Sequence, residues 1–245
     1  MALVEELELQ GKWLFKHRGV LPLLILTLGI LVFVQSELKQ DPFFIDKAYY
    51  ELFCLLVSLF GLFIRIVTVG YIPKRTSGRN KNLIADKLNT SGMYSLVRHP
   101  LYVGNFFMWL GPSMLTANFW FICSFCLFYR IYYERIMFAE EQFLRNKFGA
   151  YYLDWAKDVP SFIPNFKNYI KPDLPFSWKR ILEKEKNGLL ALFTIFCFFD
   201  ILGELVNGRR DFNYILIGAW VLSGLYYLVI KFLEKRTTLL KETGR

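Results

Sequence analysis

Two polar stretches of this sequence gather residue types that can hold or move a proton. The first runs from residue 90 to residue 104 and contains Arg98 and His99. The second runs from residue 134 to residue 164 and contains Glu140 and Glu141. His99 and the two glutamates are the few candidate bases here. Taken alone, the first stretch also fits an interfacial membrane anchor, and the second fits an amphipathic helix with solvated carboxylates.

The two stretches together form a more specific pattern. It reads Arg-His-Pro-x-Tyr-x-Gly at residues 98–104, a helical hairpin, then Glu-Glu-x-x-Leu at 140–144, Phe-Gly-x-x-Tyr at 148–152 and Val-Pro at 159–160. This pattern, including the spacing of 42 residues from Arg98 to Glu140, resembles the isoprenylcysteine carboxyl methyltransferase family and its wider membrane relatives, which include phospholipid methyltransferases. The resemblance covers residues 73–164. It implies an enzyme that transfers a methyl group from S-adenosylmethionine to a membrane lipid or lipidated substrate.

The resemblance also implies roles for individual residues. Catalytic candidates are His99, Arg98 and Glu141. Implied cofactor contacts are Asp86, Lys87, Leu88, Asn89, Tyr94, His99, Pro100, Leu101, Tyr102, Glu140 and Tyr152. Candidate substrate-binding residues are Arg135, Arg79 and Arg65.

Two of these arginines have two interpretations each. Arg79 lies in the basic turn at 73–80, which either anchors the chain at the membrane or holds an anionic head group. Arg65 lies inside an apolar run, where a charge is either functional or extends to the nearer membrane face. No metal site is expected, because the four cysteines lie in apolar runs and the chain has two histidines.

The residue types suit methyl transfer from a sulfonium. Aromatic faces bind such cations, and Tyr94, Tyr102, Tyr152 and Trp155 are available. Glu140 can accept hydrogen bonds from ribose hydroxyls or the amino group of the cofactor. In-line methyl displacement needs correct placement of the acceptor and exclusion of water, but no metal or covalent nucleophile.

The acceptor stays open at this level. A phosphate or carboxylate is already ionised at neutral pH and needs no base, whereas an amine needs deprotonation first. Ile136 stands where the carboxyl methyltransferases place a substrate-binding arginine; Arg135 is adjacent but points about 100° away on a helix. Residues 76–80 and 88–94 are similar to a bacterial branch that methylates the phosphate of lipid A. We therefore expect O-methylation of a lipid phosphate first, a prenylcysteine carboxylate second and a phospholipid amine third.

A non-catalytic membrane scaffold is the competing class of function. Cofactor binding separates the two classes, because only an intact methyltransferase pocket should bind S-adenosylmethionine.

Long apolar runs dominate the chain and predict membrane spans. The sequence is 54% hydrophobic, and its runs approach the ~20 residues that a bilayer core requires. We expect an all-α integral membrane bundle of about six transmembrane helices with a cytoplasmic cofactor pocket. The spans are 19–36, 52–72, a hairpin from 101 to 133 hinged near Ala117 and Asn118, 188–206 and 214–230. The helix after the hairpin should leave the membrane and end near Gly149.

The basic residues predict the orientation. Segments 1–18, 73–100, 134–187 and 231–245 contain 24 of the 30 Lys and Arg residues, and six spans place these segments on one side. By the positive-inside rule both termini are then cytoplasmic, in the plasma (inner) membrane if the source is bacterial. The same rule accounts for the net charge of +9 without a nucleic-acid partner. Residues 1–186 are expected to form the methyltransferase core, and residues 187–245 a two-helix membrane extension.

Overall fold

The protein is helical throughout the part that the structure describes. In this computed structural model the described residues are 2–39, 47–73 and 83–240, and they contain no β-strand. The elements are α1 (Leu3–His17), α2 (Leu21–Lys39), α3 (Lys47–Tyr71), α4 (Met93–Leu96), α5 (Pro100–Leu115), α6 (Phe119–Phe148), α7 (Ala150–Asp158), the 3₁₀-helix η1 (Phe166–Asn168), α8 (Trp178–Val206) and α9 (Tyr214–Arg236). The all-α class is confirmed.

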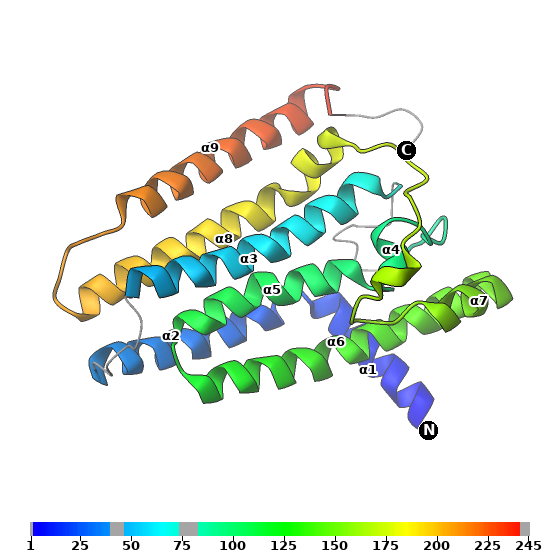
Figure 1. Cartoon of the computed structure of the whole chain (residues 1–245), viewed down its shortest axis with the longest axis horizontal. Coiled ribbons are helices and arrows are strands. Elements are labelled where there is room, and N and C mark those ends of the chain that lie inside the picture. Colours follow the sequence, from blue (N-terminus) through cyan, green and yellow to red (C-terminus); the bar gives the residue numbers. More distant parts are fainter. Residues whose placement is uncertain (1, 40–46, 74–82, 241–245) are drawn as a thin grey trace.

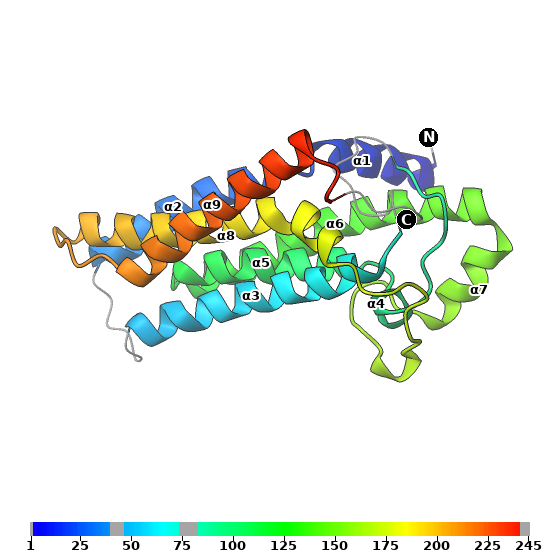
Figure 2. The same cartoon turned by 90° about the horizontal axis from the view of Figure 1, so that it is seen from above.

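The long helices α2, α3, α5, α6, α8 and α9 lie side by side and form an elongated bundle, in which α8, α3 and α5 lie between α9 and α6 (Figure 1). From above, α7 folds away from the end of α6 (Figure 2). The start of α1, the short helix α4, α7 and the end of α9 all lie at one end of the bundle. The α5–α6 turn and the α8–α9 loop lie at the other end. We call these the motif end and the far end.

Within the described residues, four helices are long and apolar enough to cross a membrane, at Pro22–Lys39, Lys47–Tyr71, Trp178–Val206 and Tyr214–Arg236. The chain is therefore an integral membrane protein. The other two expected spans differ: α5 has 16 residues, and α6 has 30 but carries charged residues along its second half. The count of six spans stays a prediction.

The outer faces of the long helices are apolar and exposed. On α2 and α3 they include Leu24, Leu28, Leu31, Leu52, Phe53, Leu56, Phe60 and Phe63. In a water-soluble bundle such faces would be polar, whereas in a bilayer the hydrocarbon covers them at no cost.

Small residues bring α3 and α5 into close contact. A Cβ added to Gly61 would collide with the Gly104 carbonyl, and one added to Gly111 would collide with Ser58. This is the close backbone approach by which membrane helices associate, since lipid gives no hydrophobic drive for them to do so. The contact fixes the start of α5, where the first motif stretch begins.

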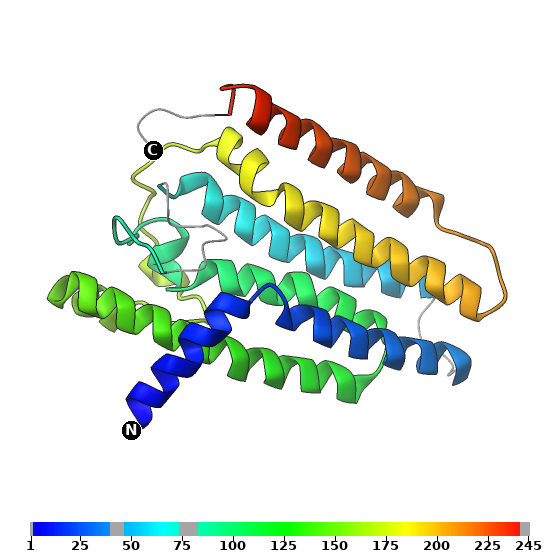
Figure 3. The same cartoon turned by 180° about the vertical axis from the view of Figure 1, so that it is seen from behind.

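The predicted hairpin is confirmed in detail. Ala117 has a positive φ of 52°, and the side chain of Asn118 caps α6 by accepting a hydrogen bond from the Phe121 amide at 2.9 Å. Helix α6 runs on past the apolar run and ends at Gly149, where φ is 57°. The sequence did not predict α1, which crosses α6 (Figure 3) with Gly11 against the Arg135 backbone.

The fifth helix that was expected as a span begins earlier than predicted, whereas the sixth begins at Tyr214 as predicted. Helix α8 starts at Trp178 and continues without a break across residue 186, where the sequence suggested a domain boundary. Residues 178–186, the last polar residues before the expected boundary, therefore belong to the same helix as the start of the C-terminal extension.

Candidate functional site

His99 lies at the motif end between two consecutive glutamates of α6. It precedes Pro100, which begins α5, and its side chain is buried, with 7% exposed. Its Nε2 lies 3.0 Å from Glu141 Oε1, and its Nδ1 lies 3.4 Å from Glu140 Oε2. Because α5 and α6 form an antiparallel hairpin, the start of α5 meets the second half of α6, so that His99 contacts Glu141, 42 residues later in the chain. The two sequence stretches thus form one cluster.

Two further motif residues complete this cluster. Arg98 Nη1 lies 3.2 Å from Glu141 Oε2, and Tyr102 donates a hydrogen bond of 2.7 Å to Glu140 Oε1. The rings of His99 and Tyr102 stack with centroids 5.7 Å apart. We call Arg98, His99, Tyr102, Glu140 and Glu141 the motif cluster. The candidate catalytic residues and Glu140 are all in it.

The charges of the cluster are coupled. Burial alone would lower the pKa of His99, but its hydrogen bonds to Glu140 and Glu141 outweigh burial and raise the pKa above 6.5. Burial alone would raise the pKa of Glu141, but His99 and Arg98 outweigh it and lower that pKa below 4.5. These contacts therefore favour the protonated form of His99 and the ionised form of Glu141.

Three buried donors beside this cluster have no hydrogen-bond partner among the described residues. They are Arg98 Nε, the Tyr152 hydroxyl and Trp155 Nε1. Tyr152 is 3% exposed, and its ring packs on Trp155 with centroids 5.8 Å apart. Its hydroxyl lies near Glu141 and Arg98, although neither contact meets hydrogen-bond geometry. Buried donors are rarely left unsatisfied in a native protein, so these atoms point to a polar ligand.

Other predicted cofactor contacts lie next to the cluster. Pro100 is fully buried, and Leu101 and Tyr94 pack on an apolar patch around Val69 and Ile181. Burial raises the pKa of the Tyr94 hydroxyl, and the nearby Glu140 carboxylate adds to this effect.

The stretch from Asp86 to Asn89 is less engaged with the cluster. Leu88 is buried, but Lys87 is exposed and faces Asp173, with Nζ 3.6 Å from Oδ2. Asp86 is exposed and Asn89 half-buried. Their role as cofactor contacts stays a prediction.

The predicted substrate arginines have different surroundings. Arg65 does not extend to the membrane surface, because Glu185 of α8 and Asn105 of α5 hold it inside the bundle. Arg135 is half-buried where α6 packs against α1, and the neighbouring Ile136 is completely buried. Arg79 lies outside the described residues. Glu185 and Asn105 were not foreseen; the signal for Glu185 was the need of an intramembrane arginine for a partner.

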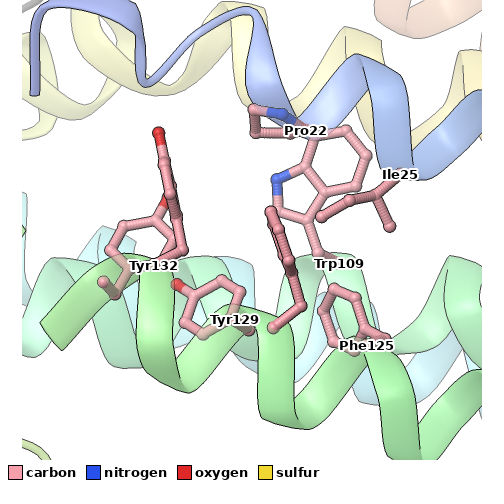
Figure 4. Close-up of a pocket in the computed structure, with 8 residues that line it drawn as sticks. Pro22, Ile25, Trp109, Phe125, Tyr129 and Tyr132 are labelled. Carbon is pink, nitrogen blue, oxygen red and sulfur yellow. The ribbon is translucent and has the colours of Figure 1, made fainter. Parts of the chain in front are cut away.

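An apolar cleft opens between α2, α5 and α6 (Figure 4). Its lining is mostly aromatic: Pro22, Ile25, Trp109, Phe125, Phe128, Tyr129, Tyr132 and Tyr133. The hydroxyl of Tyr129 donates a hydrogen bond of 2.7 Å to the carbonyl of Tyr102. An apolar surface therefore lies directly behind the motif cluster.

Known proteins share this part of the chain. Residues 50–151, which include the whole motif cluster, match the phospholipid methyltransferase family. The matched part of the chain is similar to membrane methyltransferases of the phospholipid and isoprenylcysteine type. No solved structure matches it.

Three relatives illustrate the extent of the match. The protein-S-isoprenylcysteine O-methyltransferase of Schizosaccharomyces pombe is 43% identical over 89 residues, 36% of each chain. Protein-S-isoprenylcysteine O-methyltransferase B of Arabidopsis thaliana is 38% identical over 121 residues, 44% of this chain and 59% of that protein. A cobalt-zinc-cadmium resistance protein of Cupriavidus metallidurans is 32% identical over 117 residues, 47% of this chain and 52% of that protein.

The chain spans about a third to three fifths of the length of these relatives. The family match ends at residue 151, so Tyr152 and Trp155 follow directly after it and α8 and α9 lie beyond it. The family match therefore bears on the motif cluster but not on α8 and α9.

Proposed function

We propose that this protein transfers a methyl group from S-adenosylmethionine to a membrane-embedded acceptor, most simply by O-methylation of an anionic head group. The observation that carries the proposal is the motif cluster together with its three buried, unpartnered donors. The similarity to known proteins supports the same reaction class, since named relatives are O-methyltransferases.

The donor and acceptor groups at the cluster fit the proposed cofactor. Arg98, Tyr152 and Trp155 would hold its carboxylate, because their free hydrogens are donors only a negative or lone-pair oxygen can satisfy. Glu140 and Glu141 would accept from its amino group and hydroxyls. Tyr102 offers an aromatic face for the sulfonium. When bound, S-adenosylmethionine supplies an electrophilic methyl group; the residues named here bind, orient and exclude water.

The protonation state of His99 argues for an acceptor that is already ionised. His99 lies between two carboxylates that favour its protonated form, which makes its imidazole less available as a base. An amine acceptor would need such a base, whereas a phosphate or a carboxylate would not.

Between the two anionic acceptors we place a lipid phosphate, such as that of lipid A, first. Ile136 is buried core at the position where the carboxyl methyltransferases place an arginine, which removes one cation for a prenylcysteine carboxylate. The prenylcysteine carboxylate is second, supported by the names of the relatives. A phospholipid amine is third.

We also propose that the motif end faces the cytoplasm, with both termini on that side and six spans. Both ends of the described chain lie at the motif end (Figure 1), as an even number of spans requires. Cysteine labelling of Lys87→Cys and Arg209→Cys in intact cells should modify only Arg209→Cys with an impermeant reagent. Labelling of Lys87→Cys instead would show that the motif end faces the outside of the cell.

Product identification tests the proposed function. Purified protein in detergent would be incubated with methyl-labelled S-adenosylmethionine and total membrane lipid, and the product analysed by mass spectrometry. Label in a lipid phosphate methyl ester is the expected result. Label in a prenylcysteine ester or on nitrogen keeps the enzyme class and replaces the acceptor. Absence of both label and cofactor binding would instead support a scaffold.

A further inference from the structure

A buried ion pair outside the motif cluster joins the C-terminal helices to the matched core. Arg65 Nε lies 2.8 Å from Glu185 Oε2, and Arg65 Nη2 lies 2.8 Å from Glu185 Oε1. The Glu185 side chain is 4% exposed and that of Arg65 is 20% exposed. Two parallel hydrogen bonds of this kind fix both the distance and the angle between the partners. Helix α8 is thereby held in one register against α3.

The third arm of the guanidinium reaches α5. Arg65 Nη1 donates a hydrogen bond of 2.7 Å to Asn105 Oδ1. The aliphatic stem of Arg65 lies over the neighbouring motif glycine, because a Cβ on Gly104 would come within 2.5 Å of Arg65 Cγ. Arg65 thus contacts two consecutive residues in the first turns of α5, Gly104 and Asn105.

The same turns of α5 hold the cofactor-site carboxylate. Tyr102, three residues before Asn105, donates its hydrogen bond of 2.7 Å to Glu140. The Tyr102 carbonyl accepts from Tyr129, whose ring stacks on Tyr133 with centroids 4.1 Å apart. Tyr133 in turn makes a polar contact with Asn105. A shift or rotation of α5 at Asn105 would therefore displace Tyr102 and Glu140 together.

We propose that Glu185 is a positioning residue supplied by the C-terminal extension: it clamps Arg65, and Arg65 holds the first turns of α5 so that Tyr102 and Glu140 keep the geometry that binds the cofactor. This inference rests on the proposed function. It assigns the α8–α9 extension, which lies beyond the family match, a part in the site rather than a role as a lipid-facing cover.

The neighbouring residue provides a matched control. Lys186 of α8 pairs with Glu234 of α9, so both partners of this ion pair lie in the extension. We would compare Glu185→Gln with Glu234→Gln. Both changes remove one carboxylate charge and leave its cation, Arg65 or Lys186, without compensation.

The test measures two quantities in detergent: the affinity for S-adenosylhomocysteine by calorimetry, and the thermal unfolding midpoint without ligand. Glu185→Gln should weaken binding at least tenfold, while Glu234→Gln leaves it within twofold. The double variant Arg65→Gln with Glu185→Gln has no orphaned charge. It should recover the unfolding midpoint but not the affinity, because the grip on Asn105 and over Gly104 is lost.

The outcomes separate the inference from the proposed function. Unchanged affinity in Glu185→Gln would overturn the inference and leave the proposed function standing. If the double variant recovers both the affinity and the unfolding midpoint, the Arg65–Glu185 ion pair is a purely structural contact, and the inference is also overturned. If Glu185→Gln does not fold, the double variant alone decides. If the unaltered protein does not bind S-adenosylhomocysteine, the proposed function fails, and the inference fails with it.

Discussion

Charged residues gather at both ends of this bundle, yet among the described residues only the group at the motif end has buried hydrogen-bond donors without a partner. At the far end, Glu37 accepts from Lys47 at 2.7 Å and from Asn207 at 2.5 Å. Asp200 and Glu204 there accept from backbone amides of the α8–α9 loop at 3.1 Å. At the motif end, Arg98, Tyr152 and Trp155 each keep a buried donor without a partner.

This difference indicates that the far-end cluster has a structural role, whereas the motif cluster can bind a ligand. The far-end carboxylates cap and tie together the ends of α2, α3 and α8, and their bonds are made within the chain. The motif cluster and the neighbouring Tyr152 and Trp155 contain three buried donors that no described residue satisfies. An exposed polar group would be hydrated, but a buried one needs either an ordered water or a ligand.

The largest expected effect tests this contrast directly. Glu140→Ala removes the acceptor shared by Tyr102 and His99 and should weaken S-adenosylhomocysteine binding roughly tenfold to a hundredfold, the loss typical of a hydrogen bond to a charged group. Glu37→Ala removes the corresponding carboxylate at the far end and should leave that affinity unchanged. Calorimetry on both variants measures this. Equal losses of affinity in the two variants would show that the two ends do not differ in ligand binding.

A smaller effect follows from the titration of the motif cluster. The pKa of His99 is raised above 6.5, so its stabilisation is complete below pH 6.5 and is lost as pH rises through the raised pKa. The pKa of Glu141 is lowered below 4.5, so its stabilisation is complete above pH 4.5 and is lost as pH falls through the lowered pKa. The stability difference between the unaltered protein and His99→Gln should be largest between pH 4.5 and pH 6.5, where both contributions are complete.

Thermal unfolding midpoints of the two proteins, measured from pH 4 to pH 9, check this. A difference that shrinks on the alkaline side supports a charged His99 between the two glutamates. A constant difference would mean that His99 acts through packing alone.

The smallest effect concerns the predicted cofactor stretch before α4. The side chains of Lys87 and Asp173 are 68% and 58% exposed, and exposed pairs of this kind typically contribute under ~1 kcal/mol. Lys87→Ala should therefore change the unfolding midpoint little. Its effect on S-adenosylhomocysteine affinity should be within about threefold. A large loss of affinity with an unchanged midpoint would extend the ligand site beyond the motif cluster to this stretch.

Much of this protein followed from the sequence alone. The apolar runs predicted the membrane class and the helices α2, α3, α8 and α9, because a bilayer demands long uncharged segments. The hinge at Ala117 and Asn118 and the end of α6 at Gly149 followed from local turn preferences. The motif spacing predicted that His99 and Glu140 serve the same site.

Only the tertiary structure decided how the polar groups are paired. The 42 residues between His99 and Glu141 suggest a common site, but the antiparallel docking of α5 on α6 decides that one imidazole lies between two consecutive carboxylates. Arg65 and Glu185 are 120 residues apart, and no local pattern relates them. Their pairing depends on the register in which α8 packs against α3. Helix periodicity in a sequence shows which face is apolar, whereas the buried partner of a charge depends on which other helix covers that face.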